Sequence, residues 1–78
     1  MSEKRITITL TNLLSQGIRT KNVPYVDPDA LRADINSFMQ EVGYHHDVEN
    51  IALSLAPEWS ETDEELETLF NIERGLSC

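Results

Sequence analysis

The residues with the clearest chemical potential are the carboxylates between residues 57 and 70. Acids in the first turn of a helix are stabilised by the partial positive charge of its amino end, which accounts for Glu61, Asp63 and Glu64. Glu65 follows Glu61 by four residues, and like charges at this spacing mildly destabilise a helix. The stretch PEWSETDEELETLF contains no basic residue and six acids: Glu58, Glu61, Asp63, Glu64, Glu65 and Glu67.

A second row of acids belongs to the segment 27–43. Asp27, Asp34 and Glu41 are spaced by seven residues, so they line one flank of a helix. If this row adjoins the acids of 57–70 in space, the charges could resemble a row of phosphates and occupy the basic groove of a nucleic-acid-binding protein. The alternative is an acidic surface that only keeps a small protein in solution.

The other reactive side chains do not form a recognisable catalytic or metal motif. His45 and His46 are adjacent, so their side chains diverge, and a zinc site needs three or four ligands. They are expected in a loop, where a pH-sensitive contact could form because histidine titrates near neutrality. Cys78 is the last residue and has no nearby base to activate it. The sequence therefore predicts a protein that is not an enzyme and has no cofactor and no metal.

The composition limits the class of protein. At 78 residues, 40% of them hydrophobic, the chain is expected to form one small acidic domain over 1–78. A lone cysteine fits a reducing compartment, and no apolar run is long enough for a membrane span, so we expect a cytoplasmic protein without a membrane partner.

Charge is distributed unevenly along the chain. Residues 1–21 carry four bases and one acid, whereas residues 22–78 carry two bases and thirteen acids. The acidic body argues against direct nucleic-acid binding and favours a partner protein with a basic surface.

The first third of the chain predicts one strand and one short helix. Residues 5–11 alternate apolar and threonine side chains, as in a half-buried strand. That strand needs a partner, which could be 23–26 or a second chain, so a homodimer is an option. Residues 11–22 have apolar side chains at helical spacing, and a short helix is favoured there. Pro24 restricts 22–26 to an edge strand or an extended connector.

The remainder predicts helices. The segment 27–43 has an N-cap aspartate, a proline at the first helical position, a core stripe and a terminal glycine. Residues 47–59 fit a helix or a strand, and their alanines favour the helix. The last helix begins near residue 60, with a capping box from Ser60 and Asp63 or from Thr62 and Glu65. The expected fold is a small, mainly helical α+β domain with one N-terminal strand and three to four helices.

The aromatic residues divide between the core and the surface. Phe38 and Phe70 are expected in the core, together with Leu66 and Leu69. Three aromatic residues next to the expected helices could anchor a protein interface. They are Tyr25, Tyr44 and Trp59.

The N-terminal half also loosely resembles the ribbon-helix-helix repressors. In that family the strand pairs with its twin in a dimer and places outward side chains in the major groove, which here would be Arg5, Thr7 and Thr9. The resemblance covers about half of the chain, and the two aspartates that open the following helix do not suit a phosphate contact. The chain is therefore not assigned to that family.

Three functions follow from these patterns. The first is a small acidic protein-binding module, an inhibitor or nucleic-acid mimic that occupies a basic site on a partner. The second is a dimeric DNA-binding regulator or antitoxin whose basic N-terminal strand contacts DNA through Lys4, Arg5, Thr7 and Thr9. The third is a structural or assembly subunit. A small acidic chain is also typical of phage and mobile-element proteins.

Overall fold

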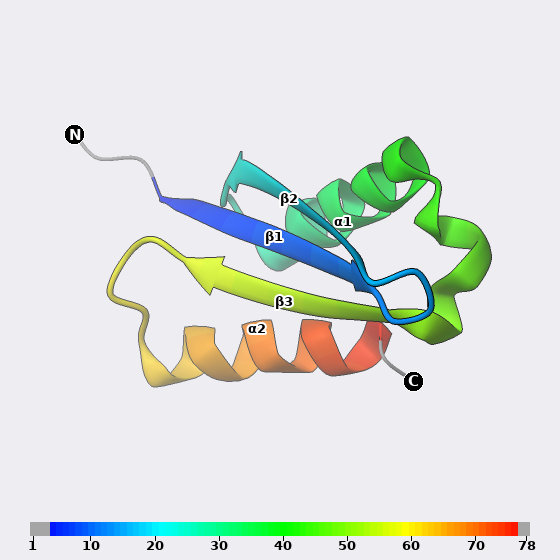
Figure 1. Cartoon of the computed structure of the whole chain (residues 1–78). Helices are drawn as coiled ribbons and strands as arrows, with labels where there is room; N and C mark the ends of the chain where they lie inside the picture. Colours follow the sequence, from blue (N-terminus) through cyan, green and yellow to red (C-terminus); the bar gives the residue numbers. More distant parts are fainter. Residues whose placement is uncertain (1–3, 77–78) are drawn as a thin grey trace.

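The computed structural model describes residues 4–76 (Figure 1). Three strands and two α-helices follow one another with a short 3-10 segment between the first helix and the last strand. In chain order they are β1 (Arg5–Asn12), β2 (Gly17–Pro24), α1 (Pro28–Val42), η1 (Tyr44–Asn50), β3 (Ile51–Pro57) and α2 (Asp63–Leu76).

The three strands form one antiparallel sheet in the order β2-β1-β3. At its centre Thr9 of β1 lies opposite Thr20 of β2 and Ser54 of β3. The prediction of a single N-terminal strand is therefore wrong, although an α+β fold is correct. β1 finds both of its partners within the chain, so its backbone groups need no second copy.

Alternation along β1 separates the core from an open sheet face. Ile6, Ile8 and Leu10 are fully buried, and they join side chains of α1, α2 and β3 in one hydrophobic core. The threonines between them point to the other face, which neither helix covers in Figure 1, where α1 passes behind β2 and α2 runs beside β3. The result is two layers, a sheet and a pair of helices.

The short helix expected over 11–22 is instead a β-hairpin. The buried Asn12 side chain accepts hydrogen bonds from the N–H groups of Leu14 (3.0 Å) and Ser15 (3.2 Å), and its carbonyl accepts one from Gln16. Gln16 has a φ of 62°, a left-handed conformation that ends the turn. Side-chain to backbone bonds of this kind compete with helix formation. Residues 17–24 also gain backbone hydrogen bonds to β1 when they form a strand.

The segment 47–59 also adopts the alternative that was not favoured. β3 forms over residues 51–57, with Ile51, Leu53 and Leu55 buried on the core face. Before it, Asp47 has φ and ψ angles of −122° and 39°, which interrupt the helical segment. Pairing with the second edge of β1 outweighs the small helical preference of the two alanines.

The helix over 27–43 is confirmed with both of its ends. The Asp27 side chain accepts from the Ala30 N–H at 2.7 Å, and Pro28 follows at the first position. Gly43 ends α1 with a φ of 79°, in the left-handed region that favours glycine. Within residues 4–76, neither helix combines the length and the apolar character that crossing a membrane requires.

Candidate interaction surfaces

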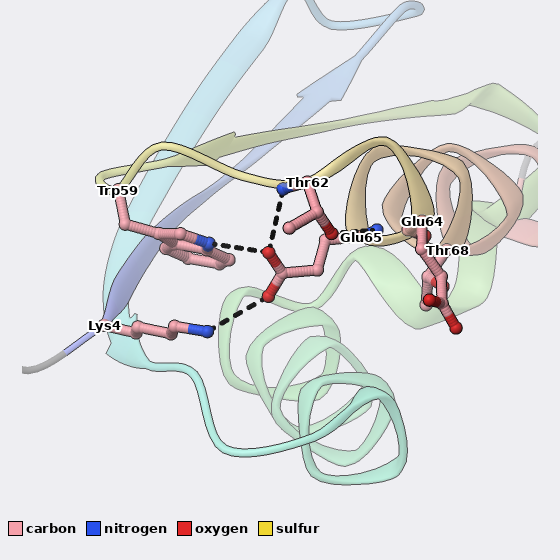
Figure 2. Close-up of polar contacts among 6 residues, drawn as sticks. All are labelled: Lys4, Trp59, Thr62, Glu64, Glu65 and Thr68. Carbon is pink, nitrogen blue, oxygen red and sulfur yellow. Dashed lines mark hydrogen bonds and ion pairs between the residues drawn. The ribbon is translucent and has the colours of Figure 1, made fainter.

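The amino end of α2 is closed by a capping box. The Thr62 N–H donates to Glu65 Oε1 at 3.0 Å, and the Glu65 N–H donates to Thr62 Oγ1 at 3.2 Å. One of the two predicted boxes is therefore confirmed. Figure 2 shows that the same carboxylate also receives the indole N–H of Trp59 at 3.4 Å and the ammonium of Lys4 at 3.1 Å.

These contacts change the acidity of Glu65. The backbone hydrogen bond from Thr62 is the largest cause, followed by the hydrogen bonds from Lys4 and Trp59, and together they lower its pKa to about 2. A carboxylate with three donors is held in its ionised form. Glu65 thus joins α2 to the residue that precedes β1 and to the loop before the helix.

Two of the three predicted aromatic anchors pack on each other. The rings of Tyr25 and Trp59 are stacked, with centroids 5.1 Å apart, and the ammonium of Lys4 lies 5.5 Å from the Trp59 ring. Both side chains are half-buried against the core. Burial raises the pKa of the Tyr25 hydroxyl, and the negative charges of Glu65 and Asp27 raise it further.

The third predicted anchor, Tyr44, is also half-buried against the core. Its hydroxyl lies where a side chain on Gly17 would be, only 2.7 Å from an ideal Cβ at that position. All three aromatic residues therefore stabilise the fold, and each keeps only part of its surface accessible.

The outer face of α2 combines carboxylates with apolar side chains. Asp63, Glu64 and Glu67 are exposed, and no ion pair among residues 4–76 engages their side chains. Leu66 and Phe70 were expected in the core, but they are 45% and 56% exposed. They are exposed because α2 packs on the core through a different side of the helix.

That buried stripe consists of Leu69 and Ile72, which are 4% and 6% exposed. Arg74 is the one base on α2, and its guanidinium lies 5.4 Å from the centroid of the Phe70 ring. A cation over an aromatic face is a favourable contact, and here it holds the ring on the helix surface.

The acidic flank of α1 lies away from α2. Glu41 Oε2 accepts from the Lys21 ammonium of β2 at 3.1 Å, so this flank faces the β2 side of the sheet. Arg32 and Asn36 occupy the opposite side of α1, where they line a groove toward α2. Asp34 lies about 200° around the helix from Arg32 at 3.6 residues per turn. The acidic rows of the two helices therefore do not adjoin.

The remaining predicted acids lie before α2. Glu61 is half-buried, and Glu58 follows the end of β3. Glu58 Oε2 accepts from the Asn22 side-chain amide and, at 3.4 Å, from the Thr7 hydroxyl. The Arg5 guanidinium donates to the Asn22 side chain.

Those contacts also locate the residues of the DNA-binding alternative. Arg5 and Thr7 belong to a polar cluster at one end of the open sheet face, Thr9 lies on the same face, and Lys4 is paired with Glu65. A ribbon-helix-helix dimer needs its first strand free to pair with a twin. Here β1 is the central strand and has both edges occupied.

The histidines lie in the 3-10 helix η1 and not in a loop, and their side chains do not diverge as expected. The ring centroids of His45 and His46 are 3.9 Å apart. Across residues 4–76, His, Cys, Asp and Glu side chains do not gather into any group of three that could hold a metal ion. Cys78 lies outside the described residues.

Three features of the surface were not predicted from the sequence. The tip of the β1–β2 hairpin exposes Leu13 and Leu14, with Ile18 beside it at 64% exposure. A groove of about 320 Å³ separates α1 from α2, with Ile35, Leu53 and Ile72 among its lining residues. β2 is an edge strand of the sheet. The apolar residues at helical spacing in 11–22 predicted a helix, so neither the hairpin tip nor the β2 edge was expected. Both depend on pairing with β1.

Comparison with known proteins adds no relative. A scan of protein-family models, a search of curated proteins and a search of solved structures each returned no match to this chain.

Proposed function

We propose that this chain is a small acidic protein-binding module whose outer α2 face receives a basic surface of another protein. The observation that carries the proposal is the exposure of Phe70 and Leu66 beside carboxylates that have no basic partner within residues 4–76. Helix stability accounts for acids at the start of α2, but it does not account for Glu67, which lies four residues after Asp63.

The charges of this face suit rapid recognition of a basic partner. The chain has a formal net charge of −8, and three carboxylates of α2 are exposed and form no ion pair within residues 4–76. Such a field accelerates encounter with a positively charged surface and disfavours nucleic acid and anionic lipid. The association is therefore expected to weaken as salt is added.

The apolar side chains would supply the short-range part of the interface. Leu66 and Phe70 are four residues apart, so they form one apolar patch bordered by Asp63 and Glu67. Aromatic side chains that become buried at the centre of an interface often dominate its binding energy. A basic partner with an apolar pocket fits this combination.

Rigid support of α2 favours the same role. The capping box at Thr62 and Glu65 fixes the start of the helix, and Leu69 and Ile72 anchor it on the core. A preorganised helix loses little conformational entropy on binding. The module would inhibit its partner wherever the occupied basic site is itself functional, such as a nucleic-acid-binding groove. We place this activity in the cytoplasm because a single cysteine fits a reducing compartment.

The test compares two triple variants with equal charge changes. One variant carries Asp63→Asn, Glu64→Gln and Glu67→Gln on α2. The control carries Asp29→Asn, Asp34→Asn and Glu49→Gln elsewhere. Both are checked for native circular dichroism and used as bait at low and high salt. The proposal expects a partner that binds the wild type and the control, is lost with the α2 variant, and is released by salt.

A second experiment locates the contact. A photoreactive phenylalanine analogue in place of Phe70 should crosslink to a lysine- and arginine-rich surface of that partner, which mass spectrometry identifies. Retention of the same partner by the α2 variant, or crosslinks only from other faces, would contradict the proposal.

A further inference from the structure

The two edges of the sheet differ in how their backbone groups are covered. At the β3 edge, the outward N–H of Leu55 donates to Glu73 Oε1 of α2 at 3.0 Å. Figure 1 shows α2 running along this edge for the length of the strand. At the β2 edge the side chains of residues 18–22 are all exposed, α1 passes behind the strand, and it reaches this edge at Lys21, which pairs with Glu41. One edge is closed by a helix, and the other is open.

The ladder between β1 and β2 defines which backbone groups of β2 are free. The Tyr25 N–H donates to the Lys4 carbonyl at 2.8 Å, and bonded pairs recur at every second residue of an antiparallel pair. Residues 19, 21 and 23 therefore bond to β1. The N–H groups of Ile18, Thr20 and Asn22 point away from the sheet, with the spacing that an added strand requires.

The side chains of β2 specify the chemistry of such a strand. Ile18 and Thr20 are on the open sheet face, whereas Arg19 and Lys21 share the face of Leu10 and Ile8. Arg19 is exposed and takes part in none of the ion pairs formed among residues 4–76. An added strand would pair best with acids on the side of Arg19 and apolar residues on the side of Ile18.

A second copy of the chain is a poor occupant of this edge. Antiparallel pairing of β2 with its twin around Thr20 would place Arg19 opposite Lys21 of the other copy. Like charges that lie directly opposite each other destabilise a strand pair. Positive residues on an edge strand are a known protection against self-association. Pairing of β2 with β2 of a second copy is therefore disfavoured, whereas pairing with a strand that carries acids at these positions is not.

We infer that the β2 edge binds an extended segment of another protein in which acidic and apolar residues alternate. The segment would add as a fourth antiparallel strand, with main-chain bonds to Ile18, Thr20 and the N–H of Asn22, and an acid against Arg19. The Asn22 carbonyl accepts from the Arg5 guanidinium at 3.4 Å, so the added strand would bond mainly at Ile18 and Thr20. This surface is distinct from the outer face of α2, and its occupant has the opposite charge. The inference therefore stands without the function proposed above.

The test uses two synthetic peptides and three variants of the whole chain. The probe is acetyl-Val-Glu-Val-Glu-Val-Glu-Val-amide, and the control peptide has lysine in place of each glutamate. Amide resonances and hydrogen exchange are followed by NMR for the wild type, Thr20→Pro, Thr20→Ala and Arg19→Glu. Thr20→Pro removes an outward N–H without removing a bond to β1, and Thr20→Ala keeps that N–H.

The acidic peptide is expected to shift the amides of Ile18, Thr20 and Asn22 and to slow their exchange. Thr20→Pro should weaken its binding at least tenfold, Thr20→Ala should bind as the wild type does, and Arg19→Glu should prefer the lysine peptide. The inference is overturned if those amides respond to neither peptide or if Thr20→Pro binds as well as Thr20→Ala. Protection of the same amides that depends on protein concentration without peptide would also overturn it, because the occupant would then be a second copy.

Discussion

Thr62 and Glu65 cap the amino end of α2 reciprocally, each donating its backbone N–H to the side chain of the other. The same Glu65 carboxylate binds Lys4 and Trp59, so one residue connects the last helix with the start of β1 and with the loop between β3 and α2. Three donors, from Lys4, Trp59 and Thr62, therefore depend on the charge of a single carboxylate.

The first prediction concerns the pH dependence of stability. The pKa of Glu65 is about 2 in the folded protein, below its ordinary value of 4.5. The stabilisation that the ionised Glu65 gives the folded state is therefore complete above pH 4.5, and it is lost as the pH falls from about 4.5 to about 2. Melting temperatures of the wild type and Glu65→Gln between pH 7 and pH 2 should differ most near neutrality and converge in acid. A difference that does not change with pH would contradict this assignment.

The N-cap of α1 provides a second prediction. Asp27→Ala removes the acceptor of the Ala30 N–H and should reduce the free energy of unfolding by about 1 kcal/mol. Asp27→Asn keeps an acceptor oxygen, so its free energy of unfolding should fall much less. Urea denaturation of both variants measures the difference. Equal losses would mean that the charge of Asp27, and not the hydrogen bond, stabilises the helix.

The closed sheet edge can be tested at Glu73. Glu73→Ala leaves the outward Leu55 N–H without its acceptor and should reduce the free energy of unfolding by about 1–3 kcal/mol. The Leu55 amide should also exchange faster with solvent. Glu73→Gln retains a carbonyl oxygen and serves as the control. Unchanged exchange at Leu55 in the alanine variant would show that α2 covers the edge in another way.

Substitutions at adjacent positions of β1 should differ sharply in their effect on stability. Ile8 is fully buried, and Ile8→Ala should reduce the free energy of unfolding by about 2–5 kcal/mol through lost burial and a cavity. Thr9 points to the open sheet face, so Thr9→Ala should cost less than about 1 kcal/mol. Chemical denaturation measures both. Similar losses at the two positions would contradict the two-layer arrangement.

A charge reversal on α2 separates stability from binding. Asp63 and Glu67 are like charges four residues apart, so Glu67→Lys should stabilise the protein by a few tenths of a kcal/mol, as expected for an i, i+4 pair. The proposed function expects the same change to weaken partner binding at least tenfold. A thermal melt and the pull-down comparison test the two effects. A variant that is more stable and still binds fully would reduce this face to a solvated acidic surface.

Several features of this protein could be predicted from sequence because they depend on residues close together in the chain. The alternation of β1, the caps and core stripe of α1, and the capping box of α2 are local patterns of this kind. The excess of acids beyond residue 22 is likewise a property of composition. None of these depends on which segment lies beside which.

The tertiary structure decided the rest, because short apolar segments have nearly equal local preference for helix and strand. Residues 17–24 and 51–57 became strands since β1 has two edges whose backbone groups need partners. Their pairing turned Leu14 outward at the hairpin tip, and the packing of α2 on Leu69 and Ile72 left Phe70 exposed. The acidic rows were separated in the same way, because the flank of α1 that meets α2 is set by the core and not by the spacing of its charges.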